Sequence, residues 1–247
     1  MERFDLTQLK CYRSLRDAKR LERSLGTLGG GNHFIEVDQA KDGTYYLVIH
    51  SGSRNLGKQV AEIYQHLAID LHAGKEAYFK ERDEIIHTYK EQGRRAEIQD
   101  RLKQLKENYE IQKLDAPNDI CWLYGPFMDD YLHDVEICQR FARRSRERMA
   151  EIIIETTKMT RTETFHTIHN YIDVNEMILR KGAIAAHAGE KVLIPINMRD
   201  GSVLAVGKGN VEWNNSAPHG AGRIMSRTKA KQSIDLEEYK ASMQGIY

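Results

Sequence analysis

Histidines stand at positions where a polypeptide can approach a ligand closely. His33 follows a run of three glycines, His50 ends an apolar, strand-like segment, and His169 stands in another such segment. Neutral imidazole is the most common side-chain metal ligand, and glycine loops and strand ends bring the backbone near a ligand. Three histidines at strand ends of one sheet can therefore converge on a metal. Three ordinary hydrogen-bonded histidines are the alternative, and spacing alone does not decide between them.

His219 indicates a different chemistry. Pro218 restricts the chain before it, and Gly220 removes side-chain bulk after it. A histidine held in this way can act as an in-line nucleophile on phosphorus and form a phosphoramidate. Residues 213–234 contain four basic side chains and no acidic one, a composition that suits phosphate groups. A glycine-rich turn with solvated basic residues is the structural alternative.

Strand-like and helix-like segments surround these histidines. Residues 34–37 and 45–50 are rich in β-branched and aromatic side chains and are predicted to be neighbouring strands. Further strands are predicted at 164–170, 182–187, 192–195 and 202–208, and helices within 5–24 and at 58–72 and 131–159. This order of elements argues against regular βαβ winding. It predicts an α+β fold with a mixed β-sheet core and peripheral helices.

Residues 75–114 differ from the sequence around them, since 19 of these 40 residues are charged. Their apolar residues recur at helical spacing on either side of Gly93. We predict a projecting, charged helical hairpin inserted in the domain, with its break at Gly93. A solvated structural arm is the simplest interpretation. An arm that docks a partner or guides RNA is the alternative.

Composition limits the class of protein. A chain of 247 residues with 40% hydrophobic and 30% charged residues is typical of a globular domain, which we place at 1–247. The net charge of +1 predicts no nucleic-acid partner from bulk charge, so any such partner must be bound by a local basic patch. The absence of a long apolar run and of a signal-peptide core predicts no membrane association. Three cysteines without CxxC spacing favour a reduced, cytoplasmic protein.

Five short motifs occur in order along residues 24–232: GGGNHFIE at 29–36, HSGSRNLG at 50–57, HNY at 169–171, KGA at 181–183 and SAPHGAGRIMSR at 216–227. Together they resemble the RtcB family of RNA-splicing ligases, and HSGSR with PHGAGR is the most specific pair. The resemblance implies GTP- and Mn²⁺-dependent joining of RNA 3′-phosphate or 2′,3′-cyclic phosphate ends to 5′-hydroxyl ends, in tRNA splicing or RNA repair. It also implies RNA as the partner, one or two Mn²⁺ ions, and an activating protein as a further candidate partner.

The resemblance also implies a role for individual residues. His219 is expected to attack the α-phosphate of GTP, giving histidine–GMP, from which GMP passes to the RNA 3′-phosphate and is displaced by the 5′-hydroxyl. The other implied roles are manganese ligands for His33, His50 and His169; contacts to the guanylate for Asn32, Phe34, Glu36, Asn197, Ser202, Ala221 and Gly222; and RNA-phosphate contacts for Arg54 and Arg227.

The chain departs from the family pattern in three places. The upstream Asp-x-x-Cys segment, which supplies further metal ligands, has no counterpart, because Cys11 stands in a different context. The Pro-Gly-Ser-Met pocket loop is replaced by Pro195–Met198, with Asn197 in place of serine. The C-terminal segment with its lysine is not matched either. We therefore expect a short form of the family. A catalytically incomplete nucleotide- or RNA-binding protein and a metal-dependent phosphoesterase are the alternatives.

Overall fold

The computed structural model describes residues 4–109 and 117–246. The chain divides into two compact units, one formed by residues 1–23 and 53–138 and the other by residues 24–52 and 139–247. Among the described residues, no helix has both the length and the apolar character needed to cross a membrane. The placement of one catalytic domain at 1–247 stays a prediction.

The first unit is helical. Its helices are α1 (Ala18–Arg23), α2 (Arg54–His72), α3 (Glu76–Glu91), α4 (Ile98–Asn108) and the first part of α5 (Gly125–Thr157), with short 3₁₀ turns at Tyr12–Ser14, Arg95–Glu97 and Asn118–Ile120. Helix α2 begins four residues before its predicted start, because the side chain of Ser53 caps it and accepts a hydrogen bond from the amide of Gly57 at 3.2 Å. Buried side chains follow one face of α2 at helical spacing, among them Val60, Tyr64 and Ala68.

A buried carboxylate joins three segments of this unit. The side chain of Asp134, on α5, is fully buried and accepts hydrogen bonds from the amides of Lys10 at 2.8 Å and Cys11 at 3.0 Å, and from the hydroxyl of Tyr64 at 2.9 Å. Burial alone would raise the pKa of Asp134, but the hydrogen bonds from the amides of Cys11 and Lys10 outweigh it and the pKa is lowered. Asp134 therefore ties the N-terminal segment and α2 to α5.

We expect the substitution Asp134→Asn to destabilise the protein by about 2–4 kcal/mol, because an amide has one acceptor oxygen and turns its NH₂ group toward the buried donors. Tyr64→Phe removes a single donor and should cost about 1 kcal/mol. Urea unfolding followed by circular dichroism measures both. Equal unfolding midpoints for Asp134→Asn and the unmodified protein would contradict the assigned role of Asp134.

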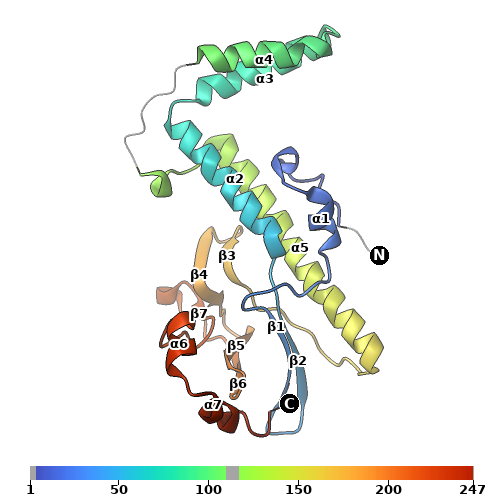
Figure 1. Ribbon diagram of the computed structural model, residues 1–247, viewed down its shortest axis with the longest axis vertical. Helices are drawn as coiled ribbons and strands as arrows, with labels where there is room; N and C mark the ends of the chain where they lie inside the picture. Colours follow the sequence, from blue (N-terminus) through green and yellow to red (C-terminus); the bar gives the residue numbers. More distant parts are fainter. Residues whose placement is uncertain (1–3, 110–116, 247) are drawn as a thin grey trace. The chain divides into compact units, whose positions relative to one another are not determined.

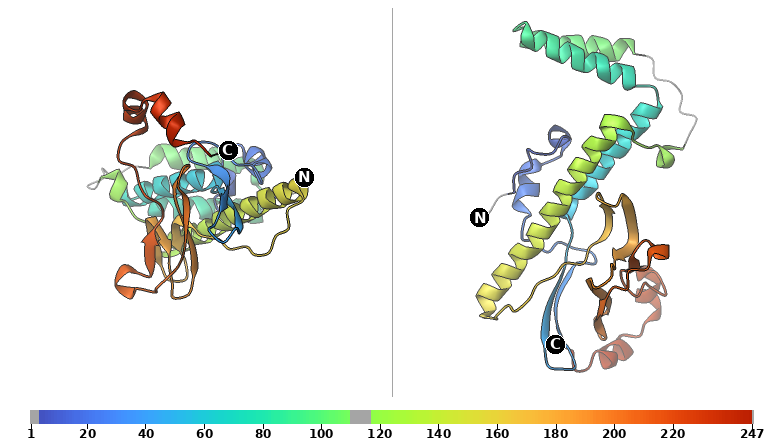
Figure 2. Two further views of the ribbon diagram at one scale, coloured as in Figure 1. Left: turned by 90° about the horizontal axis from the view of Figure 1, so that it is seen from below. Right: turned by 180° about the vertical axis from the view of Figure 1, so that it is seen from behind.

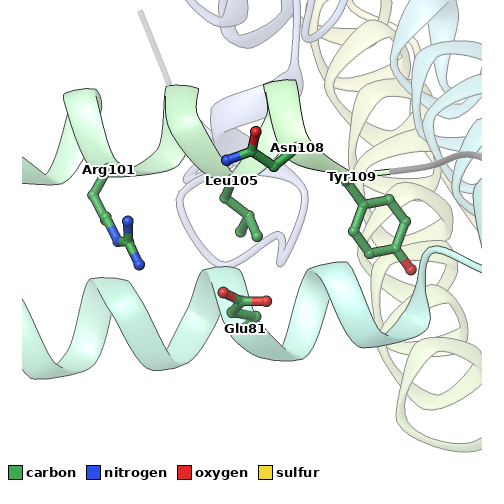
Figure 3. Close-up of a pocket in the computed structure, with 5 residues that line it drawn as sticks. All are labelled: Glu81, Arg101, Leu105, Asn108 and Tyr109. Carbon is green, nitrogen blue, oxygen red and sulfur yellow. The ribbon is translucent and has the colours of Figure 1, made fainter.

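Helices α3 and α4 lie side by side (Figures 1 and 2). The chain turns between them at Gly93, whose φ of +71° favours glycine. The structure has helices on both sides of Gly93, whereas the projecting hairpin inserted in the domain at 75–114 stays a prediction. Residues 110–114 of that segment lie outside the described part of the chain. A small polar pocket between the two helices is lined by Glu81 from α3 and by Arg101, Leu105, Asn108 and Tyr109 from the α4 side (Figure 3). None of the predicted site residues lines this pocket.

The second unit carries the strands. They are β1 (Phe34–Gln39), β2 (Tyr45–His50), β3 (His169–Asp173), β4 (Ile178–Ala185), β5 (Lys191–Asn197), β6 (Gly201–Val206) and β7 (Ser216–Pro218), followed by the short helices α6 (Arg227–Ser233) and α7 (Leu236–Ser242). The strands form three separate sheets, β1-β2, β3-β4-β7 and β5-β6, and every pairing is antiparallel. The unit also includes the second part of α5, from Gln139 onward.

The α+β class is confirmed, but the predicted mixed β-sheet core is absent from the described residues. The reason is the length of the connections: β1-β2, β3-β4 and β5-β6 are each joined by a short turn, which permits only an antiparallel pair. Ile184, Ala186 and Val192 are buried together, and Ile194 and Ala217 pack against them, so strands from two sheets share this small core.

A buried arginine lies at the centre of the β3-β4-β7 sheet. The guanidinium of Arg180, on β4, pairs with the carboxylates of Asp173 at 3.3 Å and Glu176 at 2.9 Å. It also donates to the hydroxyl of Ser216 and the carbonyl of Asn214, both at 3.0 Å. Arg180 thus fixes the start of β7, the strand that leads directly into His219.

Candidate functional site

Four histidines from distant parts of the sequence lie together in the second unit. The ring centroids of His33 and His50 are 6.2 Å apart, those of His50 and His169 are 5.2 Å apart, and those of His169 and His219 are 4.7 Å apart. We call these four side chains the histidine cluster. The structure brings His33, His50 and His169 together as one of the two interpretations expected, with His219 beside them, although they come from two sheets instead of one.

The β1-β2 pair positions His33 and His50. Phe34 and His50 are opposite each other in the antiparallel register, and their rings stack at 5.0 Å with an angle of 13° between planes. His33 immediately precedes β1, and its Nδ1 lies 2.8 Å from the carbonyl oxygen of Leu28. The same carbonyl accepts a hydrogen bond from the hydroxyl of Ser51 at 2.9 Å. A ring whose Nδ1–H donates to a carbonyl keeps the Nε2 lone pair available.

Strand β4 positions the other two histidines. Ile184 of β4 is paired with His169 of β3 on one side and with Ala217 of β7 on the other. His219 follows β7 directly, so the two rings lie near each other across β4. The Nδ1 of His219 lies 2.7 Å from the carbonyl oxygen of Gly182, which leaves its Nε2 free to act as a nucleophile.

Asn170 holds the carbonyl that orients His219. The register of β3 and β4 is irregular beside Asn170, whose φ is +54°, and its side-chain oxygen accepts a hydrogen bond from the amide of Gly182 at 2.7 Å. Gly182 itself has a φ of +70°, and a Cβ added there would lie 3.6 Å from the ring of His219. The HNY and KGA motifs therefore meet at the residue that bonds His219.

We expect Asn170→Gly to slow the reaction of His219 with a phosphate by about tenfold, because small displacements of a reacting group are costly. Glycine tolerates the positive φ and removes the side chain that carries the acceptor oxygen. Asn170→Asp keeps an acceptor oxygen and should restore most of the rate, and Asn175→Ala, at an exposed turn, should have no effect. Single-turnover kinetics of covalent nucleotide transfer measures this. A full rate in Asn170→Gly would contradict the role.

The environment of His50 and His169 favours their neutral forms. Burial, followed by the charges of His169 and His33, lowers the pKa of His50 to about 4. Burial and the neighbouring His219 also lower the pKa of His169. At neutral pH both rings therefore carry lone pairs of the kind that bind divalent metals.

The fit of the cluster to a metal ion is partial. The Nδ1 of His169 is buried and has no hydrogen-bond partner, as expected of a ligand atom without its metal. Within the described residues, however, no three His, Cys, Asp or Glu side chains are arranged so that they could hold one ion. Cys11 is not a substitute ligand, because burial and then Asp134 raise the pKa of its thiol. The histidines would thus supply part of a coordination shell.

Two further groups of predicted residues meet in the same unit. Glu36, on the half-buried face of β1, accepts a hydrogen bond from the hydroxyl of Ser202 on β6 at 3.2 Å. Burial and then the nearby Asp38 raise the pKa of Glu36. The amide of Ala221 donates to the carbonyl of Pro195 at 3.3 Å, which ties the loop after His219 to β5.

Other predicted residues are not brought into these contacts. Asn32 and Gly222 are exposed. The side chain of Asn197 accepts hydrogen bonds from the amides of Arg199 and Asp200 at 2.9 Å each, so it shapes the β5-β6 turn.

Two arginines, Arg54 and Arg227, are the expected contacts to RNA phosphate. Arg54 begins α2 and belongs to the first unit; its Nε is buried without a partner. The side chain of Arg227, the first residue of α6, lies outside the described part of the structure.

Sequence reasoning missed one residue beside the histidines. Arg146, on α5, donates from its Nη1 to the carbonyl of Ser51, the residue after His50, at 3.1 Å. The motifs gave no signal for it, because it lies 95 positions from Ser51 in a helix with many arginines. Arg140, Arg143, Arg144 and Arg148 share a face at helical spacing, and Arg146 does not belong to that series.

Comparison with known proteins agrees with the motifs. Residues 6–246 match the profile of the family described as tRNA-splicing ligase RtcB. The chain is 31% identical over 233 residues to the RNA-splicing ligase RtcB of Escherichia coli K12, a match that covers 87% of this chain and 49% of the relative. It is 28% identical over 273 residues to the tRNA-splicing ligase RtcB of Aeropyrum pernix, covering 93% of this chain and 51% of that protein. No solved structure matches significantly.

A histidine whose Nε2 is left free, placed beside three further histidines, is an arrangement that can act on phosphate groups. The chain belongs to the RtcB family of RNA-splicing ligases. It spans about half the length of the curated relatives it matches.

Proposed function

We propose that this chain is a GTP- and Mn²⁺-dependent RNA ligase, in a single catalytic domain, that joins RNA 3′-phosphate or 2′,3′-cyclic phosphate ends to 5′-hydroxyl ends. One observation carries the proposal: the Nδ1 of His219 faces the carbonyl of Gly182 at 2.7 Å, next to His169. That contact fixes the tautomer and leaves Nε2 as a lone-pair donor for phosphorus. Broken or spliced RNA ends, including those of spliced tRNA, are the proposed substrates, acted on in the cytoplasm.

His219 would open the reaction as a nucleophile. Its Nε2 lone pair forms the bond to the α-phosphorus of GTP while the bond from that phosphorus to the bridging oxygen breaks, and pyrophosphate leaves with the electron pair. The proton stays on Nδ1, so no general base is needed. The positive charge that develops on the ring is stabilised by the Gly182 carbonyl. The product is histidine–GMP, from which GMP passes to the RNA 3′-phosphate before the 5′-hydroxyl displaces it.

His33, His50 and His169 would each supply one ligand to one or two Mn²⁺ ions, and other groups would complete the coordination shells. When bound, Mn²⁺ neutralises phosphate charge and aligns in-line displacement. Glu36 can accept hydrogen bonds from the N–H edge of guanine, and its contact with Ser202 gives that carboxylate a defined position. Phe34, Asn32, Asn197, Ala221 and Gly222 are the further proposed guanylate contacts, and Arg54 and Arg227 the proposed RNA-phosphate contacts.

The incomplete metal shell among the described residues favours one alternative, a protein that binds nucleotide or RNA without turnover. Incubation with Mn²⁺ and GTP labelled at the α-phosphate separates the candidates. Acid-labile, alkali-stable label on the protein, together with joining of RNA ends, supports the ligase. Nucleotide binding without label supports the alternative. Hydrolysis of a cyclic phosphate without protein label would indicate a metal-dependent phosphoesterase, and either of these last two results overturns the ligase assignment.

A further inference from the structure

A half-buried arginine with one buried, unpartnered nitrogen lies at the carboxyl end of β2. The Nη2 atom of Arg146 is buried and has no hydrogen-bond partner, whereas Nη1 donates to the Ser51 carbonyl. Among the described residues, no carboxylate lies within 4.0 Å of this guanidinium. The adjacent acid, Glu147, is engaged by Arg143 at 3.0 Å and by His166 at 3.5 Å. A buried N–H donor without a partner is costly, and because this donor belongs to a cation it favours an anion as its acceptor.

The position of Arg146 identifies the anion. The residue before Ser51 is His50. Burial and neighbouring histidines lower the pKa of both His50 and His169, and the charge of Arg146 adds to that lowering. His169 contributes a second buried polar atom without a partner, its Nδ1. The second unit therefore has two nitrogens without partners. The Arg146 nitrogen is a cationic N–H donor that suits a phosphate oxygen, and the His169 ring nitrogen is of the type that binds a metal accompanying that phosphate.

We propose that Arg146 is a phosphate-binding residue of the histidine cluster, with Nη1 fixing the chain at Ser51 and Nη2 donating to a phosphate oxygen. The inference deepens the proposed ligase function and rests on it for the source of the phosphate, which is either GTP or the 3′-phosphate of RNA. The hydrogen bond from Nη1 to the Ser51 carbonyl also pre-organises Arg146 for phosphate binding, because it fixes the orientation of the planar guanidinium.

Arg146→Met and Arg146→Lys test the proposal, with Arg143→Met as the matched control. Arg143 lies one turn earlier on α5, its side chain is 62% exposed, and it pairs with Glu147. Two arms distinguish the sources: the affinity of labelled GTP, and the affinity of a fluorescent RNA oligonucleotide with a 3′-phosphate relative to the same RNA with a 3′-hydroxyl. We expect Arg146→Met to weaken at least one of these two affinities by about tenfold or more, because charge-assisted hydrogen bonds to phosphate are strong.

A third arm does not depend on the proposed function. Added phosphate should raise the thermal unfolding midpoint more in the unmodified protein and in Arg143→Met than in Arg146→Met. Phosphate stabilises many folded proteins by exclusion, so the difference between variants is the readout. If Arg146→Met does not fold, Arg146→Lys carries the test: one ammonium cannot hold Ser51 and the phosphate together, and about tenfold weaker binding is expected.

Unchanged affinity in both binding arms together with an unchanged phosphate shift, in folded Arg146→Met or Arg146→Lys, overturns the inference. Equal losses of binding affinity in Arg143→Met and Arg146→Met overturn the inference as well, since they would indicate a general effect of removing a positive charge. If the unmodified protein binds neither GTP nor RNA but keeps an Arg146-dependent phosphate shift, the proposed function fails and the phosphate site stands.

Discussion

Substituting His219 with asparagine should abolish covalent transfer of GMP to the protein. Asparagine is close to histidine in size up to its terminal atoms, but its amide nitrogen has no lone pair available for phosphorus. Removing a nucleophile costs on the order of a thousandfold or more in rate, which here means no detectable label. The measurement is protein-bound radioactivity after incubation with Mn²⁺ and α-labelled GTP.

His187→Asn is the matched control for this experiment. His187 belongs to the same unit but lies outside the histidine cluster, and its Nε2 is 3.4 Å from the carboxylate of Glu176. Labelling should persist in His187→Asn at the level of the unmodified protein. Label retained in His219→Asn would show that another group is guanylylated, and the assigned nucleophile would be wrong.

The second large effect concerns Arg180. Arg180→Met should destabilise the protein by about 3 kcal/mol, because it leaves Asp173 and Glu176 without their buried cation and removes one donor each from Asn214 and Ser216. The start of β7 would lose its side-chain tie to β4 and keep only its backbone pairing, so covalent labelling of His219 should also fall in the protein that remains folded.

A surface ion pair provides the comparison for Arg180. Glu163 accepts from the ammonium of Lys191 at 2.5 Å and is 61% exposed. Glu163→Gln should change stability by less than about 1 kcal/mol, because exposed pairs gain little. Urea unfolding measures both variants. Similar small effects of Arg180→Met and Glu163→Gln would contradict the proposed anchoring of β7.

The local elements of the fold were predictable because they are encoded by local pattern. Alternation and turn residues identify β1 and β2, and their pairing is confirmed. The break at Gly93 follows from glycine between two helical periodicities. The predicted strand over 164–170 is wrong at its start, since β3 begins at His169, and β7 was missed because three residues carry no periodic signal.

Long-range features of the fold and the site were harder to predict from the sequence. Strand ends indicate that His33, His50 and His169 can converge, but they do not place His219 beside them. The division into three sheets is not predictable either, because hydrophobic alternation is the same in one sheet or several. The contact of Arg146 with Ser51 depends on how α5 packs, and no spacing rule connects two positions so far apart. The roles of the guanylate and RNA contacts stay predictions.

Mass spectrometry of the protein after incubation with GTP and Mn²⁺ tests the central claim most directly. Peptides are generated under alkaline conditions, which preserve a phosphoramidate to histidine. We predict one added GMP on the peptide that contains His219, and no such addition in His219→Asn. An unmodified His219 peptide after incubation with GTP, or GMP attached to a lysine elsewhere in the chain, would contradict a histidine–GMP intermediate in this protein.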